Sequence, residues 1–240
     1  MHRLLSNRLS LPALLLATLI SFPASLHAQF LAPASLDFKS ILTPPPAPDS
    51  DQTKQEIEKI LSLQQSRTPE EIARAKSEVT MSPWILSGVL GSTFNPDDLP
   101  LTAKFLTQIT KDTNSLANPA KDFFARKRPP FIDPRVKPCV PLEATASYPS
   151  GHSTRATVWA LVLSEIFPDK RDALIARAHQ IGDDRVLGGV HYPSDIAAGR
   201  TLAAAIVKQM LAHPDFQKQL QAVEEECHAH VKLNSPVKSN

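Results

Sequence analysis

The stretch STRATVWALVLSEIF, residues Ser153 to Phe167, decides the fold class because it is apolar on nearly every side when wound as a helix. A helix of this kind belongs at the centre of a protein, covered by other helices. Helical spacing of apolar residues occurs in six further segments, at residues 51–66, 68–79, 99–116, 170–182, 194–213 and 214–230. No segment alternates like a strand, and no unit repeats along the chain. The sequence therefore predicts an all-α fold, a single-domain helical bundle.

Local signals predict where several of these helices begin and end. Thr68, Pro69 and Glu71 form the pattern of a capping box with proline in the first helical turn. Pro119 predicts the start of a separate short helix over residues 121–127, since proline suits a first turn and not a helix interior. Gly182 predicts the end of the helix that begins near residue 170.

Residues 1–28 have the pattern of a secretory signal peptide. Arg3 and Arg8 precede the apolar run Leu11 to Phe22, and the small residue Ala28 offers a cleavage point. The alternative is an uncleaved anchor, but the run is shorter than the roughly 20 residues that span a bilayer. The sequence thus predicts export across the inner membrane, to the periplasm.

Composition limits the range of partners. The 240 residues are 42% hydrophobic and 21% charged, which is ordinary for a soluble globular protein. Removal of residues 1–28 takes away two arginines and leaves 24 basic against 24 acidic residues, a net charge of zero. A neutral chain gives no support for nucleic-acid binding, and no other segment is long and apolar enough for stable membrane insertion.

The exported part divides into three segments. Residues 29–51 hold four closely spaced prolines, which predict an extended arm, and the apolar residues of this arm predict that it lies on the body. Residues 52–230 form the helical domain, and residues 231–240 are predicted to be a flexible tail. Cys139 and Cys227 can form a disulfide after export or remain free, since nothing in their spacing decides between the two.

The tripeptide YPS occurs twice, at residues 148–150 and 192–194, each time just before a predicted helix and beside a histidine. A helix N-terminus presents free N–H groups and a positive dipole end, which suit an anion. Asp195 follows His191 by four residues, close enough to bond the ring and fix its tautomer. The alternative is that Asp195 merely caps the helix behind Ser194.

A third stretch adds cations to this pattern. Lys121 and Arg128 are seven residues apart, or about two helical turns, and Arg185 precedes His191 by six. The three motifs, in chain order, are Lys121-x6-Arg128-Pro129, Pro149-Ser150-Gly151-His152 and Arg185-x5-His191-x3-Asp195. They closely resemble the signature of the type-2 phosphatidic acid phosphatase and vanadium haloperoxidase superfamily. Within it, the chain is most similar to the secreted class A bacterial nonspecific acid phosphatases.

The resemblance implies a role for each motif residue. His191 would be the nucleophile that forms a phosphohistidine, Asp195 would stabilise the positive ring, and His152 would be the general acid and later the base. The phosphate oxygens would be held by five residues, Lys121, Arg128, Ser150, Gly151 and Arg185. Arg126 and Lys127 are interpreted as a solvated basic face outside the site.

One position departs from the resembled family. Asp184 stands before Arg185, where the family usually has serine. The acid could repel a phosphate, or it could point away and hold Arg185.

The implied enzyme is an acid phosphatase that acts on small phosphate monoesters of broad structure, with phosphoryl transfer to alcohols as a side reaction and a homo-oligomeric state. The scheme requires no metal or other cofactor, because the surrounding cations would repel a metal ion from His191 and Asp195. The alternatives are a vanadate-dependent haloperoxidase, a noncatalytic phosphate-binding protein, and a hydrolase of pyrophosphate or lipid phosphate.

Overall fold

The computed structural model describes residues 29–32 and 35–234. Within them the chain forms helices, turns and irregular segments and no strand, which confirms the predicted all-α fold. The α-helices are α1 (Phe38–Ile41), α2 (Asp51–Ser66), α3 (Pro69–Ser77), α4 (Ser87–Leu90), α5 (Pro100–Phe124), α6 (Gly151–Ile166), α7 (Arg171–Leu187), α8 (Pro193–Ala212) and α9 (Pro214–Asn234). The predicted signal peptide, residues 1–28, lies outside the described residues.

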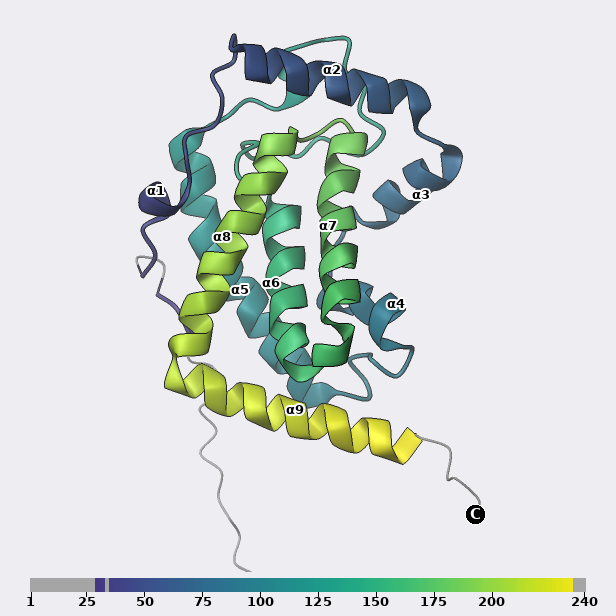
Figure 1. Cartoon of the computed structure of the whole chain (residues 1–240), viewed down its shortest axis with the longest axis vertical. Coiled ribbons are helices and arrows are strands. Elements are labelled where there is room, and N and C mark those ends of the chain that lie inside the picture. The colour runs from purple at the N-terminus through teal and green to yellow at the C-terminus, as the bar shows by residue number, and fades with distance from the viewer. Residues whose placement is uncertain (1–28, 33–34, 235–240) are drawn as a thin grey trace, which may run out of the picture.

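Helix α6 occupies the centre of the bundle, with α7 and α8 along its two sides and α5 packed against it as well (Figure 1). Helix α2 crosses one end of the bundle and α9 crosses the other. The chain runs so that α5 and α7 end, and α6 and α8 begin, at the end beneath α2. Two positive helix N-termini and all three sequence motifs are therefore gathered at one end of the molecule.

The core forms around α6 as its apolar composition predicts. Trp159 and Leu163 are completely buried, and the Trp159 Nε1–H donates to Thr110 Oγ1 at 2.9 Å. Helix α8 approaches α6 closely at Gly199, where a Cβ atom would lie 2.9 Å from the Ser150 carbonyl oxygen. The absence of a side chain at Gly199 thus lets the beginnings of α6 and α8 meet.

Two predicted helix boundaries are wrong. Helix α5 runs unbroken to Phe124, so no separate helix begins at Pro119. Its buried face, which includes Phe105, Ile109 and Leu116, packs into the core, and this packing outweighs the roughly 3 kcal/mol that an interior proline costs. Helix α7 likewise continues past Gly182 to Leu187. A Cβ at Gly182 would lie 2.9 Å from Ile196 Cγ2, so this glycine serves helix packing and ends no helix.

The N-terminal arm lies on the body, as its apolar residues predict. Phe30 packs edge-on against Phe105 and Phe216, and Leu36 and Leu42 are buried. The arm is not wholly extended, because residues 38–41 form one helical turn capped by the Asp37 carboxylate. The capping box at Thr68 and Glu71 is confirmed. At the other end, α9 extends to Asn234, so the first four residues of the predicted tail, 231–234, are helical.

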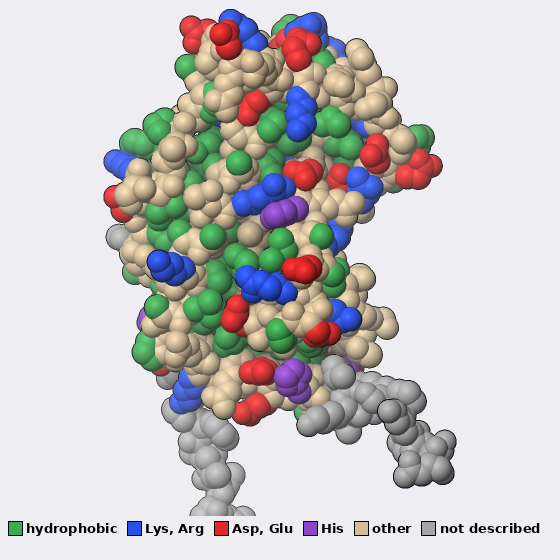
Figure 2. Space-filling model, viewed as in Figure 1, with side chains coloured by type: hydrophobic (Ala, Val, Ile, Leu, Met, Phe, Trp, Pro, Cys, Tyr) green, Lys and Arg blue, Asp and Glu red, His purple; other side chains and the backbone are tan. Residues whose placement is uncertain are grey.

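Basic and acidic side chains are interspersed over the face drawn in Figure 2, without a continuous basic stripe. Among the described helices, none has the length and hydropathy needed to cross a bilayer. Cys139 is partly exposed and Cys227 is buried beside Thr102, and both are free thiols.

Candidate active site

The centre of the site is a buried histidine–aspartate pair. His191 lies just before α8 and Asp195 lies in its first turn, and the His191 Nδ1 atom is 3.0 Å from Asp195 Oδ2. The same carboxylate oxygen accepts from the Ser147 hydroxyl and, at 2.9 Å, from the Tyr192 backbone N–H. Asp195 therefore orients the imidazole and caps α8 at once, so the two alternative roles considered for it are compatible.

Asp195 is also held by Arg126, which corrects the interpretation of Arg126 as a solvated basic residue. Its side chain is 6% exposed, and its Nη1 group donates to Asp195 Oδ1 at 2.7 Å. Its Nη2 group pairs with Glu56 of α2 at 3.0 Å, and the guanidinium covers the ring of Tyr192. The interpretation failed because burial of Arg126 depends on Glu56, which lies 70 residues away in the sequence.

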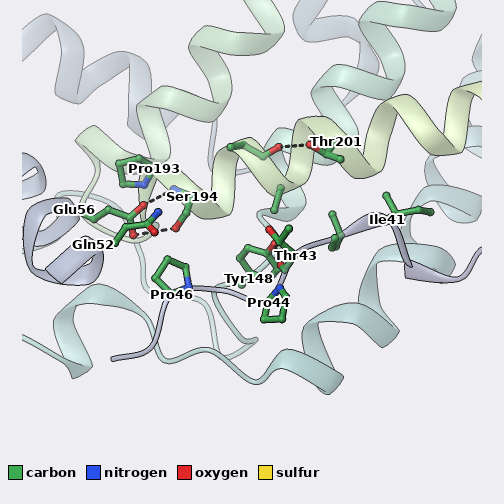
Figure 3. A pocket seen from close by; sticks show the side chains of 13 residues that line it. Ile41, Thr43, Pro44, Pro46, Gln52, Glu56, Tyr148, Pro193, Ser194 and Thr201 are labelled. Atoms are coloured by element: carbon green, nitrogen blue, oxygen red, sulfur yellow. Dashed lines mark hydrogen bonds between the residues drawn. The ribbon is translucent and has the colours of Figure 1, made fainter. Parts of the chain in front are cut away.

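Glu56 joins this network to the start of α8. Its carboxylate accepts from the Ser194 N–H at 2.8 Å and from the Ser194 hydroxyl at 2.9 Å. Figure 3 shows the two residues side by side in the lining of a cavity of about 540 Å³ between the arm and α8. Helix α2 thus fixes the position of Asp195 from behind, through Arg126 and Ser194.

The pKa values of the pair suit an uncharged imidazole beside a carboxylate. Burial alone would raise the pKa of Asp195, but the bonds from His191, Arg126 and Ser147 hold it at about 2. Burial lowers the pKa of His191 to about 4, against the opposing effect of Asp195. The Nδ1–H group donates to Asp195, which leaves the lone pair on Nε2, 3.1 Å from Arg128 Nη1. This Nε2 atom is the only nucleophilic nitrogen that the ring can offer.

Three cationic side chains lie near the two histidines: Arg128 and Lys121 act on His191, and Arg185 acts on His152. Arg128 is 1% exposed, and its guanidinium donates to the carbonyls of Thr145 and Val190. Lys121 donates from Nζ to the Ala146 carbonyl at 2.7 Å, and burial lowers its pKa to about 8, which leaves it charged at neutral and acidic pH. The chain turns between these two residues at Ala125, whose φ of +46° is left-handed.

Arg185, the third cation, has donors without acceptors. It is 1% exposed, and its Nε and Nη1 atoms are buried without a hydrogen-bond partner in the described structure. Only Nη2 is engaged, with Glu143 Oε1 at 3.3 Å. Since buried N–H groups are nearly always satisfied, this guanidinium is prepared to bind an anion.

Glu143, which the sequence did not single out, lies among these cations. Its carboxylate is 2.7 Å from Arg128, 3.3 Å from Arg185 and 3.5 Å from His152 Nδ1. Burial would raise its pKa, but His152, Arg128 and Arg185 lower it to about 2. Glu143 is 34% exposed on an irregular segment, so an entering anion can take its place against the same groups.

His152 is buried in the first turn of α6. Its Nε2 atom is 3.3 Å from the Val79 carbonyl, and Nδ1 faces Glu143. Burial lowers the pKa of His152 to about 3, with Arg185 and Arg155 as further causes and Glu143 opposing. The ring can therefore carry a proton at mild pH only when more negative charge enters beside it.

The start of α6 completes the site. Ser150 is its N-cap, with Oγ accepting from the Ser153 N–H, while the hydroxyl hydrogen is left to donate elsewhere. Gly151 begins the helix and lies beside Lys121. The Ser150 N–H donates to the Asp195 carbonyl, which ties the two helix starts together.

Asp184 does not hold Arg185 and does not face the cation cluster. Its carboxylate forms two bonds with Arg74 of α3, at 2.7 and 2.8 Å. The negative charge of Asp184, which stands where the resembled family has serine, is thus neutralised by Arg74 outside the site.

The structure brings all eight predicted site residues into one linked cluster at the end beneath α2. Sequence reasoning missed Glu56, Arg126, Glu143 and Ser147. Only Ser147 had a local signal, as the residue directly before the first YPS. The described residues contain no group of three or more His, Cys, Asp or Glu side chains that could hold a metal ion.

Over residues 101–218 the chain matches the PAP2 superfamily. It is 37% identical over 146 residues to a non-specific acid phosphatase of Providencia stuartii, covering 58% of each chain. It is 26% identical over 229 residues to an acid phosphatase of Zymomonas mobilis, covering 88% of this chain and 85% of that protein. A bacterial vanadium-dependent iodoperoxidase shares the fold, with a TM-score of 0.60, 18% identity and coverage of 76% of this chain and 53% of the other. The match to the Providencia protein thus spans under two thirds of that relative's length.

Proposed function

The chain belongs to the PAP2 superfamily, and from this membership and the cation cluster we propose that it is a metal-independent acid phosphatase acting on small phosphate monoesters. The observation that carries the proposal is Arg185, a buried guanidinium with two unpartnered donor nitrogens that shares the Glu143 carboxylate with Arg128. The similarity to proteins named as acid phosphatases supports the same reaction class. The test is release of phosphate from p-nitrophenyl phosphate by the purified protein.

The reaction proceeds through a phosphohistidine. The His191 Nε2 lone pair attacks phosphorus, the bond to the alcohol oxygen breaks, and that oxygen takes a proton from His152. Asp195 stabilises the imidazolium that results, and Arg126 keeps Asp195 ionised and in place. Water then attacks phosphorus and gives a proton to His152, which releases phosphate and restores His191. An alcohol in place of water would give phosphoryl transfer.

The phosphate group is held by Arg128, Arg185, Lys121 and the start of α6. These donors are fixed by the fold, so their charge is already oriented when negative charge builds on the oxygens in the transition state. Binding of the substrate displaces the Glu143 carboxylate from Arg128 and Arg185. We also propose that residues 1–28 direct export to the periplasm, on the pattern of their sequence.

The rate is expected to have a bell-shaped pH dependence with its maximum between about pH 4 and pH 6. Below the His191 pKa of about 4 the ring becomes protonated and loses its nucleophilic lone pair. His152 has a pKa of about 3 in the free protein and therefore holds no proton at the optimum. The proton that His152 passes to the leaving oxygen comes from the substrate monoanion. Phosphate monoesters lose that proton at about pH 6.

The measurement is kcat/KM for p-nitrophenyl phosphate from pH 3 to pH 9 in buffers of constant ionic strength. An optimum above pH 7, or a flat profile, would contradict these roles for His191 and His152.

Activity is expected to survive EDTA unchanged, because the proposed scheme uses arginine, lysine and histidine side chains where a metallophosphatase uses metal ions. Phosphate release is measured before and after prolonged dialysis against EDTA, with a zinc-dependent phosphatase treated in parallel as the control. Loss of activity that is restored by a divalent metal would overturn the scheme.

A further inference from the structure

A small polar cavity adjoins the phosphate site on the side of α5. Its volume is about 210 Å³, and its lining includes Asn114 and Asn118 of α5 and Arg155 of α6. Lys121 and Gly151 also line it, so it shares two residues with the proposed phosphate site. Ligand pockets for whole organic molecules usually exceed 300 Å³, and a space of this size and polarity suits a single small charged group.

Arg155 is the charged group of this cavity that the proposed chemistry leaves unused. It is partly buried, and the one hydrogen bond that it forms among the described residues joins Nη1 to Asn114 Oδ1 at 3.2 Å. Within the described residues it forms no ion pair, although arginines withdrawn from water are normally paired. A guanidinium has five N–H donors, so most of its capacity remains for a ligand.

Arg155 lies beside Lys121 and close enough to His152, the proposed acid, to influence its charge. A Cβ built on Gly151 would lie 3.3 Å from Arg155 Nη1 and 3.6 Å from Lys121 Cε, so the two cations lie close together across Gly151. Arg155 follows His152 by three residues on α6, which places both on neighbouring parts of the helix surface. His152 is the proposed acid for the leaving oxygen, so Arg155 lies where the leaving group would carry its next substituent.

We propose that Arg155, with Asn114 and Asn118, binds a second phosphate group, so that the chain prefers diphosphates over monophosphates of the same alcohol. The inference rests on the proposed phosphatase activity and names a substrate class for it. His191 attacks the terminal phosphorus, the anhydride P–O bond breaks, and the released monophosphate takes the proton from His152. A second phosphate is favoured over a neutral group because Arg155 adds a fourth cation to Lys121, Arg128 and Arg185, and these four outnumber the charges of one phosphate dianion and of Glu143, which also lines the cavity.

The test compares adenosine 5′-diphosphate with adenosine 5′-monophosphate, which differ in one phosphate. Arg155→Met is expected to lower kcat/KM for the diphosphate by about 10- to 100-fold and to change it for the monophosphate by less than about 3-fold. Arg171→Met, an exposed arginine at the far end of α7, is the matched control and should alter neither. Asn118→Ala supplies a second variant from α5, with a smaller loss in the same direction.

The outcomes separate the two proposals. Equal losses for both substrates in Arg155→Met would mean that Arg155 holds the transferred phosphate or supports the fold, and would overturn the second-phosphate site. An unchanged ratio of the two kcat/KM values in both variants would also overturn it. If the wild-type protein hydrolyses neither nucleotide nor p-nitrophenyl phosphate, the phosphatase proposal itself fails and this inference with it.

Discussion

Replacement of His191 with alanine is expected to lower kcat for p-nitrophenyl phosphate by about 10⁴-fold or more, the scale seen when a covalent nucleophile is removed. His191 is completely buried, its Nδ1–H is fixed by Asp195, and Nε2 faces Arg128, so no other side chain can take its place at phosphorus. Binding of phosphate should persist, since the arginines and Lys121 remain. The measurement is steady-state hydrolysis near pH 5 with EDTA, alongside phosphate binding by calorimetry.

His179→Ala is the matched control. His179 is a partly exposed histidine of α7, outside the cluster, and its removal should leave kcat unchanged. Retention of a tenth or more of the activity by His191→Ala would exclude His191 as the nucleophile. A wild-type protein that binds phosphate without turnover would support a binding role, and vanadate-dependent oxidation of iodide would favour a haloperoxidase.

Replacement of Arg126 with methionine is expected to destabilise the protein by about 3–5 kcal/mol, the cost of breaking a buried ion pair from one side. The change leaves the carboxylates of Glu56 and Asp195 facing each other in the interior without their shared cation. Activity should fall as well, because Asp195 loses the bond that fixes its second oxygen. The free energy of unfolding is measured by urea denaturation with and without phosphate.

Lys127→Met is the control, since Lys127 is the adjacent basic residue and is exposed. A second variant, Glu56→Gln with Arg126→Met, should be less destabilised than the sum of its single changes, because it removes one of the two repelling carboxylates. A loss of under about 1 kcal/mol in the free energy of unfolding for Arg126→Met would equal that of an ordinary surface salt bridge. It would contradict the buried network of Arg126, Glu56 and Asp195.

The helical class, most helix positions and the three motifs could be predicted from the amino-acid sequence alone. Each of these depends on residues within a few positions of one another: the apolar period of Ser153 to Phe167, the capping box at Thr68, and the spacing of His191 and Asp195. All the residues that make such a short-range pattern are neighbours in the sequence, so the pattern can be recognised without the fold. Boundaries that depend on a distant neighbour were wrong, as at Pro119 and Gly182, where packing against the core overrides the local preference for a helix end.

Which charges are buried, and which groups they face, depends on the folded arrangement of the helices. Arg126 and Lys127 are adjacent and equally basic, yet one is enclosed by Glu56 from α2 and the other is in water. Glu143 and Arg155 have no signal in their own neighbourhoods, and they gain a role from the helices that meet beneath α2. The physical reason is that the pKa, the pairing and the accessibility of a charge follow from every group within a few ångströms, and the folded chain draws those groups from segments far apart in sequence.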